Sequence, residues 1–259
     1  MKRIVVKIGG AILNLPLNDL WKGIEELQFG AEVVLVHGGG PQTTGMAGKL
    51  NHEPVIVQGR RVTSKLDLDI LKWVIRGELN LNLVAAAGVA GIRAVGMSGA
   101  DSGLIQVEKR PLWNVEGEKI DFGHVGDFVG TDVTALKALL QAGILPVVCP
   151  PGVDAEGNLY NINADTVALE LASAIQADEL ILVTESGGVL DATQVPIRRL
   201  RPDVAAQGVS TGWIAGGMKV KTDIGFEALS RGVSSVWITA VSSVASKREG
   251  TQLIGGGHD

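Results

Sequence analysis

Short runs of apolar residues alternate with amphipathic stretches along the whole chain. The runs are rich in valine, isoleucine and leucine and occupy residues 3–8, 31–36, 93–95, 145–149, 180–183 and 235–238. A strand that is buried on both faces has apolar side chains on both, so its sequence is a nearly continuous apolar run. These runs therefore predict the strands of a mainly parallel sheet.

Helical periodicity fills most of the intervals between the runs. Asn18 is predicted to cap a helix that ends near Gln28, a helical stretch begins at Gln42, and Ser64 is predicted to cap the next helix. The buried face expected for the helix after Ser64 consists of Leu66, Ile70, Trp73 and Val74. Further helices are predicted from Thr131 or Asp132 to Gly143, over residues 167–175 and over residues 220–229.

The alternation of strands and helices is typical of an open α/β sandwich. Residues 103–129 and 153–163 interrupt it with Gly-rich, β-like pieces, which predict hairpins. The stretch at residues 176–179 is the expected division between two lobes that share one sheet. Ligands of such sheets bind beyond the carboxyl ends of the strands, so a binding site is expected in the loops that follow the strands.

Charge and composition exclude several classes of protein. The 259 residues carry a net charge of −5, without the basic excess of a nucleic-acid-binding protein. No apolar run approaches the length of about 18 residues that a membrane span needs, and Lys7 interrupts the first run before a signal peptide could form. A single cysteine, Cys149, leaves neither a disulfide framework nor a cysteine metal site. We expect a cytoplasmic protein.

Glycine is the unusual component, with 35 residues. Gly9 and Gly10 follow Lys7 at the end of the first predicted strand. A lysine there is costly to desolvate unless an anion contacts it, and the two glycines let backbone N–H groups approach that anion. The alternative is a lysine that reaches solvent at a strand edge beside an ordinary turn.

Three consecutive glycines follow the second predicted strand. Gly38, Gly39 and Gly40 precede Pro41, which suits the first turn of a helix. Free N–H groups at the N-terminus of a helix bind anions, whereas a flexible surface loop is the alternative. His37 is expected to pack or to cap, and the histidines show no metal-ligand spacing.

Arg61 and a cluster of polar residues before the helix at 167–175 are further candidates. The Arg61 guanidinium is suited to clamping a carboxylate, although a solvated surface arginine is the commoner interpretation. Capping alone explains Asn163 and Asp165. Asn161 and Asn163 lie two residues apart in an extended segment, so both side chains are able to point at one ligand.

The last predicted helix begins after Gly216 and Gly217. Lys219 and Lys221 lie two residues apart, so only one of them is expected to face a site, and the spacing does not choose between them.

Glycine loops, lysines and one acidic residue together suggest phosphoryl transfer, which depends mainly on positioning and charge neutralisation. The chain contains no GxxxxGK[ST] or HExxH motif.

Ten short motifs follow one another in a recognisable order. They are VVKIGG (5–10), VHGGGPQ (36–42), GRRVT (59–63), GELN (77–80), GMSGADSGLI (96–105), GHVGD (123–127), LPVVCPPGV (145–153), NINAD (161–165), GGVLD (187–191) and GGMKVK (216–221). This order resembles the amino acid kinase family over essentially the whole chain. The similarity is greatest to members that phosphorylate the side-chain carboxylate of N-acetyl-L-glutamate in arginine biosynthesis.

The resemblance implies a three-layer αβα sandwich, an ATP- and Mg²⁺-dependent reaction and a homodimer. Residues 1–176 would form an N-terminal lobe that binds the acyl substrate and dimerises, and residues 177–259 would form a C-terminal lobe that binds ATP. Lys7, Lys221 and Asp165 would be catalytic, with Asp165 orienting both lysines. The implied nucleotide-binding residues are Lys7, Gly9, Gly10, Thr184, Gly187 and Lys221, and the implied substrate-binding residues are Gly39, Gly40, Arg61, Asn161 and Asn163. The nucleotide phosphates, not the protein, would hold the Mg²⁺.

The chain departs from the family pattern in a few places. Glu185 stands where an aspartate is common, which bears on ATP affinity, and residues 65–67 replace a more usual acidic start of the helix after Arg61. Members that arginine inhibits carry an additional helix before the first strand. Only two residues precede that strand here, so we expect a homodimer that arginine does not inhibit.

Two alternatives stay open. One is a kinase for α-aminoadipate or glutamate attached to a carrier protein, with Arg60, Arg61, Lys65 and Lys72 as a basic docking surface. The other is a nucleotide-binding protein of the same fold without turnover, which Glu185 favours and the three implied catalytic residues disfavour.

Overall fold

The apolar runs pair in one eight-stranded sheet in the computed structural model, which describes residues 1–57, 60–115 and 117–255. The strands are β1 (Lys2–Ile8), β2 (Ala31–His37), β5 (Ala94–Ser98), β10 (Leu145–Cys149), β13 (Glu179–Val183), β14 (Arg199–Leu200), β15 (Ser235–Thr239) and β16 (Thr251–Leu253). Their order across the sheet is β14-β16-β15-β13-β1-β2-β10-β5. All are parallel except β14 and β16, which run in the opposite direction at one edge. The prediction of a mainly parallel sheet is confirmed.

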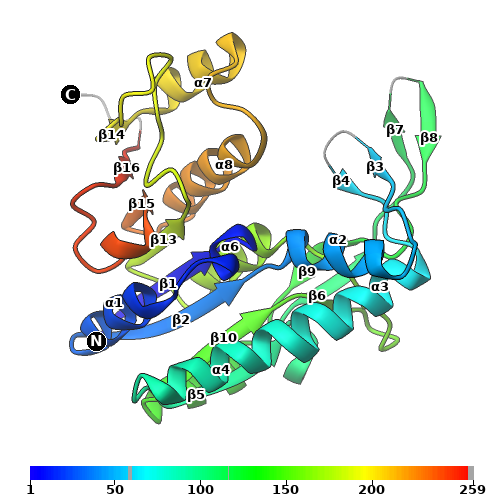
Figure 1. Ribbon diagram of the computed structural model, residues 1–259, viewed down its shortest axis with the longest axis horizontal. Helices are drawn as coiled ribbons and strands as arrows, with labels where there is room; N and C mark the ends of the chain where they lie inside the picture. Colours follow the sequence, from blue (N-terminus) through cyan, green and yellow to red (C-terminus); the bar gives the residue numbers. More distant parts are fainter. Residues whose placement is uncertain (58–59, 116, 256–259) are drawn as a thin grey trace.

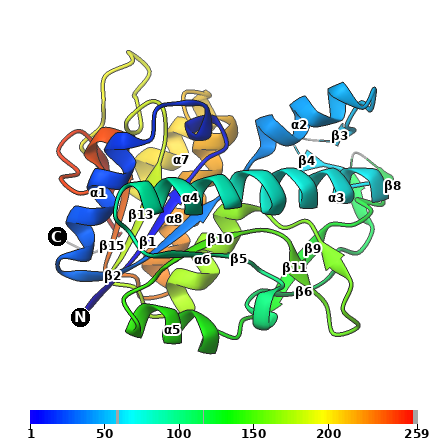
Figure 2. The ribbon, with the colours of Figure 1, turned by 60° about the horizontal axis from the view of Figure 1, so that its bottom comes forward.

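Helices cover both faces of this sheet (Figures 1 and 2). They are α1 (Asn18–Gln28), α2 (Gly40–Lys49), α3 (Lys65–Leu71), α4 (Asn80–Val89), α5 (Thr134–Gln141), α6 (Ala164–Ala174), α7 (Pro202–Thr211) and α8 (Gly216–Ser230). The π-helix η2 (Lys72–Leu79) joins α3 to α4, and η1 (Ala11–Asn14), η3 (Asp101–Gly103) and η4 (Val241–Ser243) are short 3-10 helices. α1 and α4 pack on the face that carries Ile4 and Val6 of β1, and α5, α6 and α8 pack on the face that carries Val5. The expected three-layer αβα sandwich is confirmed.

Short strands form a separate region beyond the carboxyl ends of β2 and β10. They are β3 (Ile56–Val57), β4 (Arg60–Arg61), β6 (Gln106–Lys109), β7 (Trp113–Val115), β8 (Glu118–Ile120), β9 (Gly126–Gly130), β11 (Gly152–Val153) and β12 (Leu159–Tyr160). The hairpins predicted in residues 103–129 and 153–163 are confirmed. The Arg60 guanidinium stacks on the Trp113 ring at 4.8 Å, so the β3–β4 and β7–β8 hairpins lie side by side, as Figure 1 shows.

Several predicted helix details were wrong. Leu17, not Asn18, is the N-cap of α1, and α5 begins at Thr134, after the predicted residues. Ile70 is buried, but Trp73 is 56% exposed, contrary to the expected face of the helix after Ser64. Leu66, in α3 before η2, is also exposed, so the buried face lies about one residue further along the chain than predicted. The buried positions are Asp67, Leu68, Ile70, Leu71, Val74 and Ile75.

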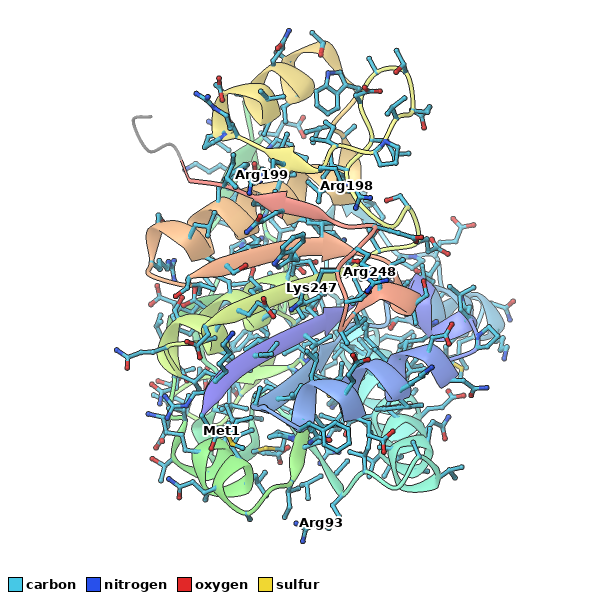
Figure 3. The ribbon with its side chains drawn as sticks, turned by 90° about the vertical axis from the view of Figure 1, so that its left-hand side faces the viewer. Met1, Arg93, Arg198, Arg199, Lys247 and Arg248 are labelled. Carbon is cyan, nitrogen blue, oxygen red and sulfur yellow. The ribbon has the colours of Figure 1, made fainter. Side chains whose placement is uncertain are left out.

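The sequence pattern missed the strands β14 and β16 at one edge of the sheet, and the helix α7. β14 and β16 have only two and three residues, so they show no continuous apolar run. Figure 3 shows the β14 edge, with Arg198 and Arg199 above Lys247 and Arg248 in the loop before β16. A short, charged edge strand resists pairing with another sheet, so this edge ends the sheet.

The expected boundary between lobes falls in the turn between α6 and β13. β13 pairs directly with β1, so the sheet crosses this boundary without interruption. Gly59 of the GRRVT motif lies outside the described residues. None of the helices in the described ranges has the length and apolar character that a membrane crossing requires.

Candidate active site

A buried lysine and a buried aspartate meet at the carboxyl end of β1. Lys7 lies two residues after Val5 in the strand, so both side chains point to the same face of the sheet, which α6 covers. Asp165 lies in the first turn of α6, whose N-cap Asn163 accepts a hydrogen bond from the Asp165 N–H at 2.9 Å. The Lys7 Nζ lies 2.8 Å from the Asp165 Oδ1, and neither side chain is more than 10% exposed.

This ion pair does not fully compensate the buried ammonium group. Burial lowers the pKa of Lys7, and the positive charge of Lys221 acts in the same direction, while Asp165 acts to raise it. A desolvated ammonium whose pKa stays lowered is stabilised by any further anion that contacts it. The site around Lys7 is therefore suited to a group with several negative charges.

The structure distinguishes the two lysines of α8. The exposed Lys219 pairs with Asp223, with 2.6 Å between Nζ and Oδ2. Lys221 is half-buried and close enough to Lys7 to affect its pKa, and its Nζ lies 3.5 Å from the Gly217 carbonyl oxygen. Lys221 is thus the lysine of this helix that faces the buried pair.

Two glycine loops touch beside the Lys7–Asp165 pair. A Cβ on Gly10 would lie 2.7 Å from Pro41 Cδ and 3.0 Å from Gly40 N, so only glycine allows this approach. Gln42 joins the loops by donating its Nε2 to the Gly10 carbonyl oxygen at 2.7 Å. Within the described ranges, the N–H groups of Gly39 and Gly40 donate no hydrogen bond, and they stand at the start of α2. Such N–H groups bind anions.

Arg61 is held in place next to α2. Its Nη1 donates to Asp67 Oδ1 at 3.1 Å, and its Nη2 donates to Thr44 Oγ1 at 2.6 Å. Asp67 also completes the capping box of α3 with Ser64. The interpretation of Arg61 as a solvated surface residue is wrong, because only 15% of its side chain is exposed.

Asn161 and Asn163 have different surroundings. The Asn161 Nδ2 donates to Thr63 Oγ1 at 3.1 Å, which links it to the segment of Arg61. Asn163 is exposed and caps α6, as its position before the helix predicted. Asn161 therefore belongs to the side of the site that Arg61 occupies, whereas Asn163 acts on the start of α6.

The loop after β13 contains the remaining candidates. The Thr184 N–H donates to the Thr239 carbonyl oxygen at 2.9 Å, which ties this loop to β15. Gly187 has a φ of 72°, a left-handed conformation that favours glycine. Glu185 is exposed.

The candidates thus form two groups connected by α2. Lys7, Asp165 and Lys221 lie at the ends of the parallel strands, and Arg61 and Asn161 lie beyond the glycine loop that starts α2. Asp165 pairs with Lys7, and its expected action on Lys221 stays a prediction. Among the described residues, no three His, Cys, Asp or Glu side chains gather as metal ligands.

Three residues that shape the site were not found in the sequence. Thr44 and Asp67 hold Arg61, and Gln42 joins the glycine loops. The spacing of Ser64 and Asp67 marks a capping box. It does not reveal that the same carboxylate also receives Arg61, because Arg61 lies outside the capping box, at the end of the β3–β4 hairpin.

Comparisons with known proteins agree with this arrangement. Residues 2–240 match the amino acid kinase family. The chain is 37% identical to the acetylglutamate kinase of Methanopyrus kandleri over 94% of this chain and 97% of that protein. It is 39% identical to the acetylglutamate kinase of Anaeromyxobacter dehalogenans over 92% of this chain and 91% of that protein.

A solved structure has the same fold. The crystal structure of smu.665 from Streptococcus mutans superposes with a TM-score of 0.82 at 26% identity, covering 92% of this chain and 94% of that one. The sheet order, the two glycine loops and the lysines at the strand ends thus occur in a chain whose sequence matches one family over nearly its whole length. The protein belongs to the amino acid kinase family.

Proposed function

We propose that this protein transfers the γ-phosphoryl group of ATP to the side-chain carboxylate of N-acetyl-L-glutamate, as a step of arginine biosynthesis. The observation that carries the proposal is the buried Lys7–Asp165 pair with Lys221 close to it, beside the free N–H groups of Gly39 and Gly40. The acetylglutamate kinases that match this chain at 37% and 39% identity support the substrate.

The reaction is an in-line displacement without an enzyme-bound intermediate. A carboxylate oxygen of the acceptor attacks the γ-phosphorus, the bond from that phosphorus to the β–γ bridging oxygen breaks, and ADP leaves. The acceptor is already ionised at neutral pH, so no general base is needed. Lys7 and Lys221 neutralise the charge of the transferring group, and Asp165 keeps Lys7 in place.

The remaining residues hold the two substrates. Arg61 has five N–H donors, of which Asp67 and Thr44 use two, so the others are free for the α-carboxylate of the acceptor, together with Asn161. The Gly39 and Gly40 N–H groups receive the attacking carboxylate. Gly9, Gly10, Thr184 and Gly187 contact the nucleotide, which carries the Mg²⁺ on its phosphates and thereby offsets part of their charge. Residues 1–176 then form the acyl-substrate lobe and residues 177–259 the ATP lobe.

The carrier-linked substrate is disfavoured by the state of the basic residues that would dock the carrier. Lys65 and Lys72 both pair with Asp69, at 2.8 Å and 2.5 Å. Arg61 is bound by Asp67, and Arg60 stacks on Trp113. Each cation is therefore already partnered within the fold, which reduces what an acidic carrier would gain by binding there.

Trapping the acyl phosphate with hydroxylamine tests the proposal. We expect hydroxamate from Mg-ATP and N-acetyl-L-glutamate, and little from glutamate or α-aminoadipate. Lys7→Ala and Lys221→Ala should each lower kcat by about 100-fold or more, because each removes a charge that stabilises the transferring group. Lys219→Ala, on the same helix but exposed, is the matched control and should keep wild-type activity.

Other outcomes of this assay would contradict the proposal. Hydroxamate from a carrier-linked acid but not from the free acetylated acid would move the assignment to the carrier-dependent reaction. ATP binding without product from any acid would indicate a protein that does not turn over. Equal losses in Lys219→Ala and Lys221→Ala would contradict the assignment of Lys221.

We also propose that the protein is a cytoplasmic homodimer that pairs through α4. Leu81 and Val89 of this helix are 61% and 92% exposed, and β5, which α4 covers, is an edge strand of the sheet. An exposed apolar helix beside an unpaired sheet edge favours association with a second copy. Insensitivity to arginine stays a prediction.

A further inference from the structure

His37 and Asn80 form a buried hydrogen-bonded pair behind the glycine loop that starts α2. Both side chains are fully buried, and the Asn80 Nδ2 lies 3.0 Å from the His37 Nε2. The other ring nitrogen, Nδ1, lies 2.9 Å from the Gly38 carbonyl oxygen. The imidazole therefore connects the first residue of α4 to the first glycine of the loop.

The partners of Asn80 determine which His37 nitrogen carries the proton. The Asn80 Nδ2 also donates to the Val147 carbonyl oxygen at 2.9 Å, and its Oδ1 accepts from Arg76 Nη1 at 2.8 Å. The amide nitrogen thus faces His37, so His37 Nε2 must accept and the proton must be on Nδ1. Burial lowers the pKa of His37 to about 4, and the charge of Arg76 acts in the same direction, so the ring is neutral at physiological pH.

The geometry of the loop has a direct consequence for the Gly39 N–H. The Nδ1–H of His37 donates to the carbonyl oxygen of Gly38, and the Gly38–Gly39 peptide bond is trans. In a trans peptide the C=O and the following N–H point in opposite directions. The Gly39 N–H is therefore turned away from the imidazole, and it has no other partner among the described residues.

The residues around this pair are closely packed. A Cβ on Gly96 would lie 2.1 Å from the Asn80 Oδ1, so a glycine is needed where Asn80 and Arg76 meet. On the other side, a Cβ on Gly39 would lie 2.6 Å from Leu79 Cδ1. The π-helical turn η2 ends at Leu79 and brings both Leu79 and Asn80 against the loop.

We infer that Asn80 and His37 are positioning residues that orient the Gly39 N–H toward the attacking carboxylate of the acceptor. The inference rests on the proposed function, because that function places the carboxylate at this N–H. Neither side chain touches the substrate; both act through the Gly38–Gly39 peptide.

Two substitutions of His37 separate positioning from packing. An asparagine amide places its nitrogen near the position of Nδ1, whereas a glutamine amide reaches the position of Nε2. We expect His37→Asn to lower kcat by at most about threefold and His37→Gln by about 10- to 100-fold, less than the loss of a whole oxyanion donor. The KM for ATP should change little in either variant. Packing alone predicts the opposite order, because glutamine is closer to histidine in volume, and that order would overturn the inference.

Nitrogen-15 NMR of the histidine rings gives a readout that does not depend on activity. At pH 7 we expect His37, identified by the signal lost in His37→Asn, to be protonated on Nδ1 only. Asn80→Asp should move a proton to Nε2, while Asn82→Asp, the same change at an exposed site of α4, should leave the ring signals unchanged. A wild-type ring protonated on Nε2 would overturn the inference. If wild-type protein makes no product, the proposed function fails, and the NMR result still decides the roles of Asn80 and His37 in the loop.

Discussion

At the scale of single residues, the site depends on polar side chains that are held by charged partners. Asp67 is the clearest case, since it is buried and contacts Arg61, Ser64 and His52. Burial raises the pKa of Asp67, but the hydrogen bonds of Ser64, His52 and Arg61 outweigh it and hold the pKa below its usual value. The ionised Asp67 carboxylate therefore stabilises the folded protein. This contribution is present above the ordinary aspartate pKa and is lost as the pH falls through the lowered pKa of Asp67.

Asp67→Asn should therefore weaken binding of the acid substrate more than binding of ATP. Without the carboxylate, Arg61 loses its charged partner, and a misplaced guanidinium should raise the KM for N-acetyl-L-glutamate about tenfold, or about 1.4 kcal/mol. The KM for ATP should stay nearly constant. Asp69→Asn is the control, because Asp69 lies on the same helix and, among the residues that the structure describes, forms its ion pairs with Lys65 and Lys72 and not with Arg61. A similar rise of both KM values in Asp67→Asn would show that the residue supports the fold in general and not Arg61.

At the scale of elements, the packing of η2 against the start of α2 determines where the glycine loop lies. Gly39→Ala would bring a Cβ within 2.6 Å of Leu79 Cδ1 and 3.0 Å of Ile75 Cγ1. Its φ of 175° is ordinary extended backbone, so the effect is steric and not conformational. We expect thermal unfolding to show a loss of about 1–3 kcal/mol, together with a lower kcat.

Gly45→Ala on the same helix α2 is the matched control. Its Cβ would meet nothing within 4 Å, so the substitution should stabilise the protein by about 0.4–1 kcal/mol. Unchanged stability and kcat in Gly39→Ala would mean that the loop moves freely away from η2, contrary to the packing described.

At the scale of the whole molecule, the proposed dimer rests on the exposed apolar residues Leu81 and Val89 of α4. The double variant Leu81→Glu, Val89→Glu should be monomeric in sedimentation experiments at concentrations where the wild type is a dimer, because it buries two carboxylates in the interface. Val195→Glu, an exposed apolar position between β13 and β14, is the control and should remain dimeric. A dimer that survives the double variant would place the interface elsewhere.

Apolar and polar patterning was enough to predict the layers of the fold and to place a candidate site at the ends of the strands. Apolar periodicity reports which faces are buried, so strands, helices and their alternation were predictable, and so were Lys7 and the glycine loops at the strand ends. The strands β14 and β16 were not, because two and three residues are too few to show an apolar run. The face of the helix after Ser64 was wrong because Leu66 and Trp73 are apolar but exposed, and the apolar pattern does not distinguish them from buried residues.

Contacts between side chains from distant segments could not be predicted from the pattern and appear only in the folded protein. Lys219 and Lys221 are equivalent in spacing, and the burial of α8 against the Lys7–Asp165 pair is what separates them. Asp67 and Thr44 hold the Arg61 guanidinium, and the His37 tautomer follows from Asn80, which is 43 positions away in the chain. Such contacts join distant segments, and their free energy depends on desolvation that exists only once the layers have packed.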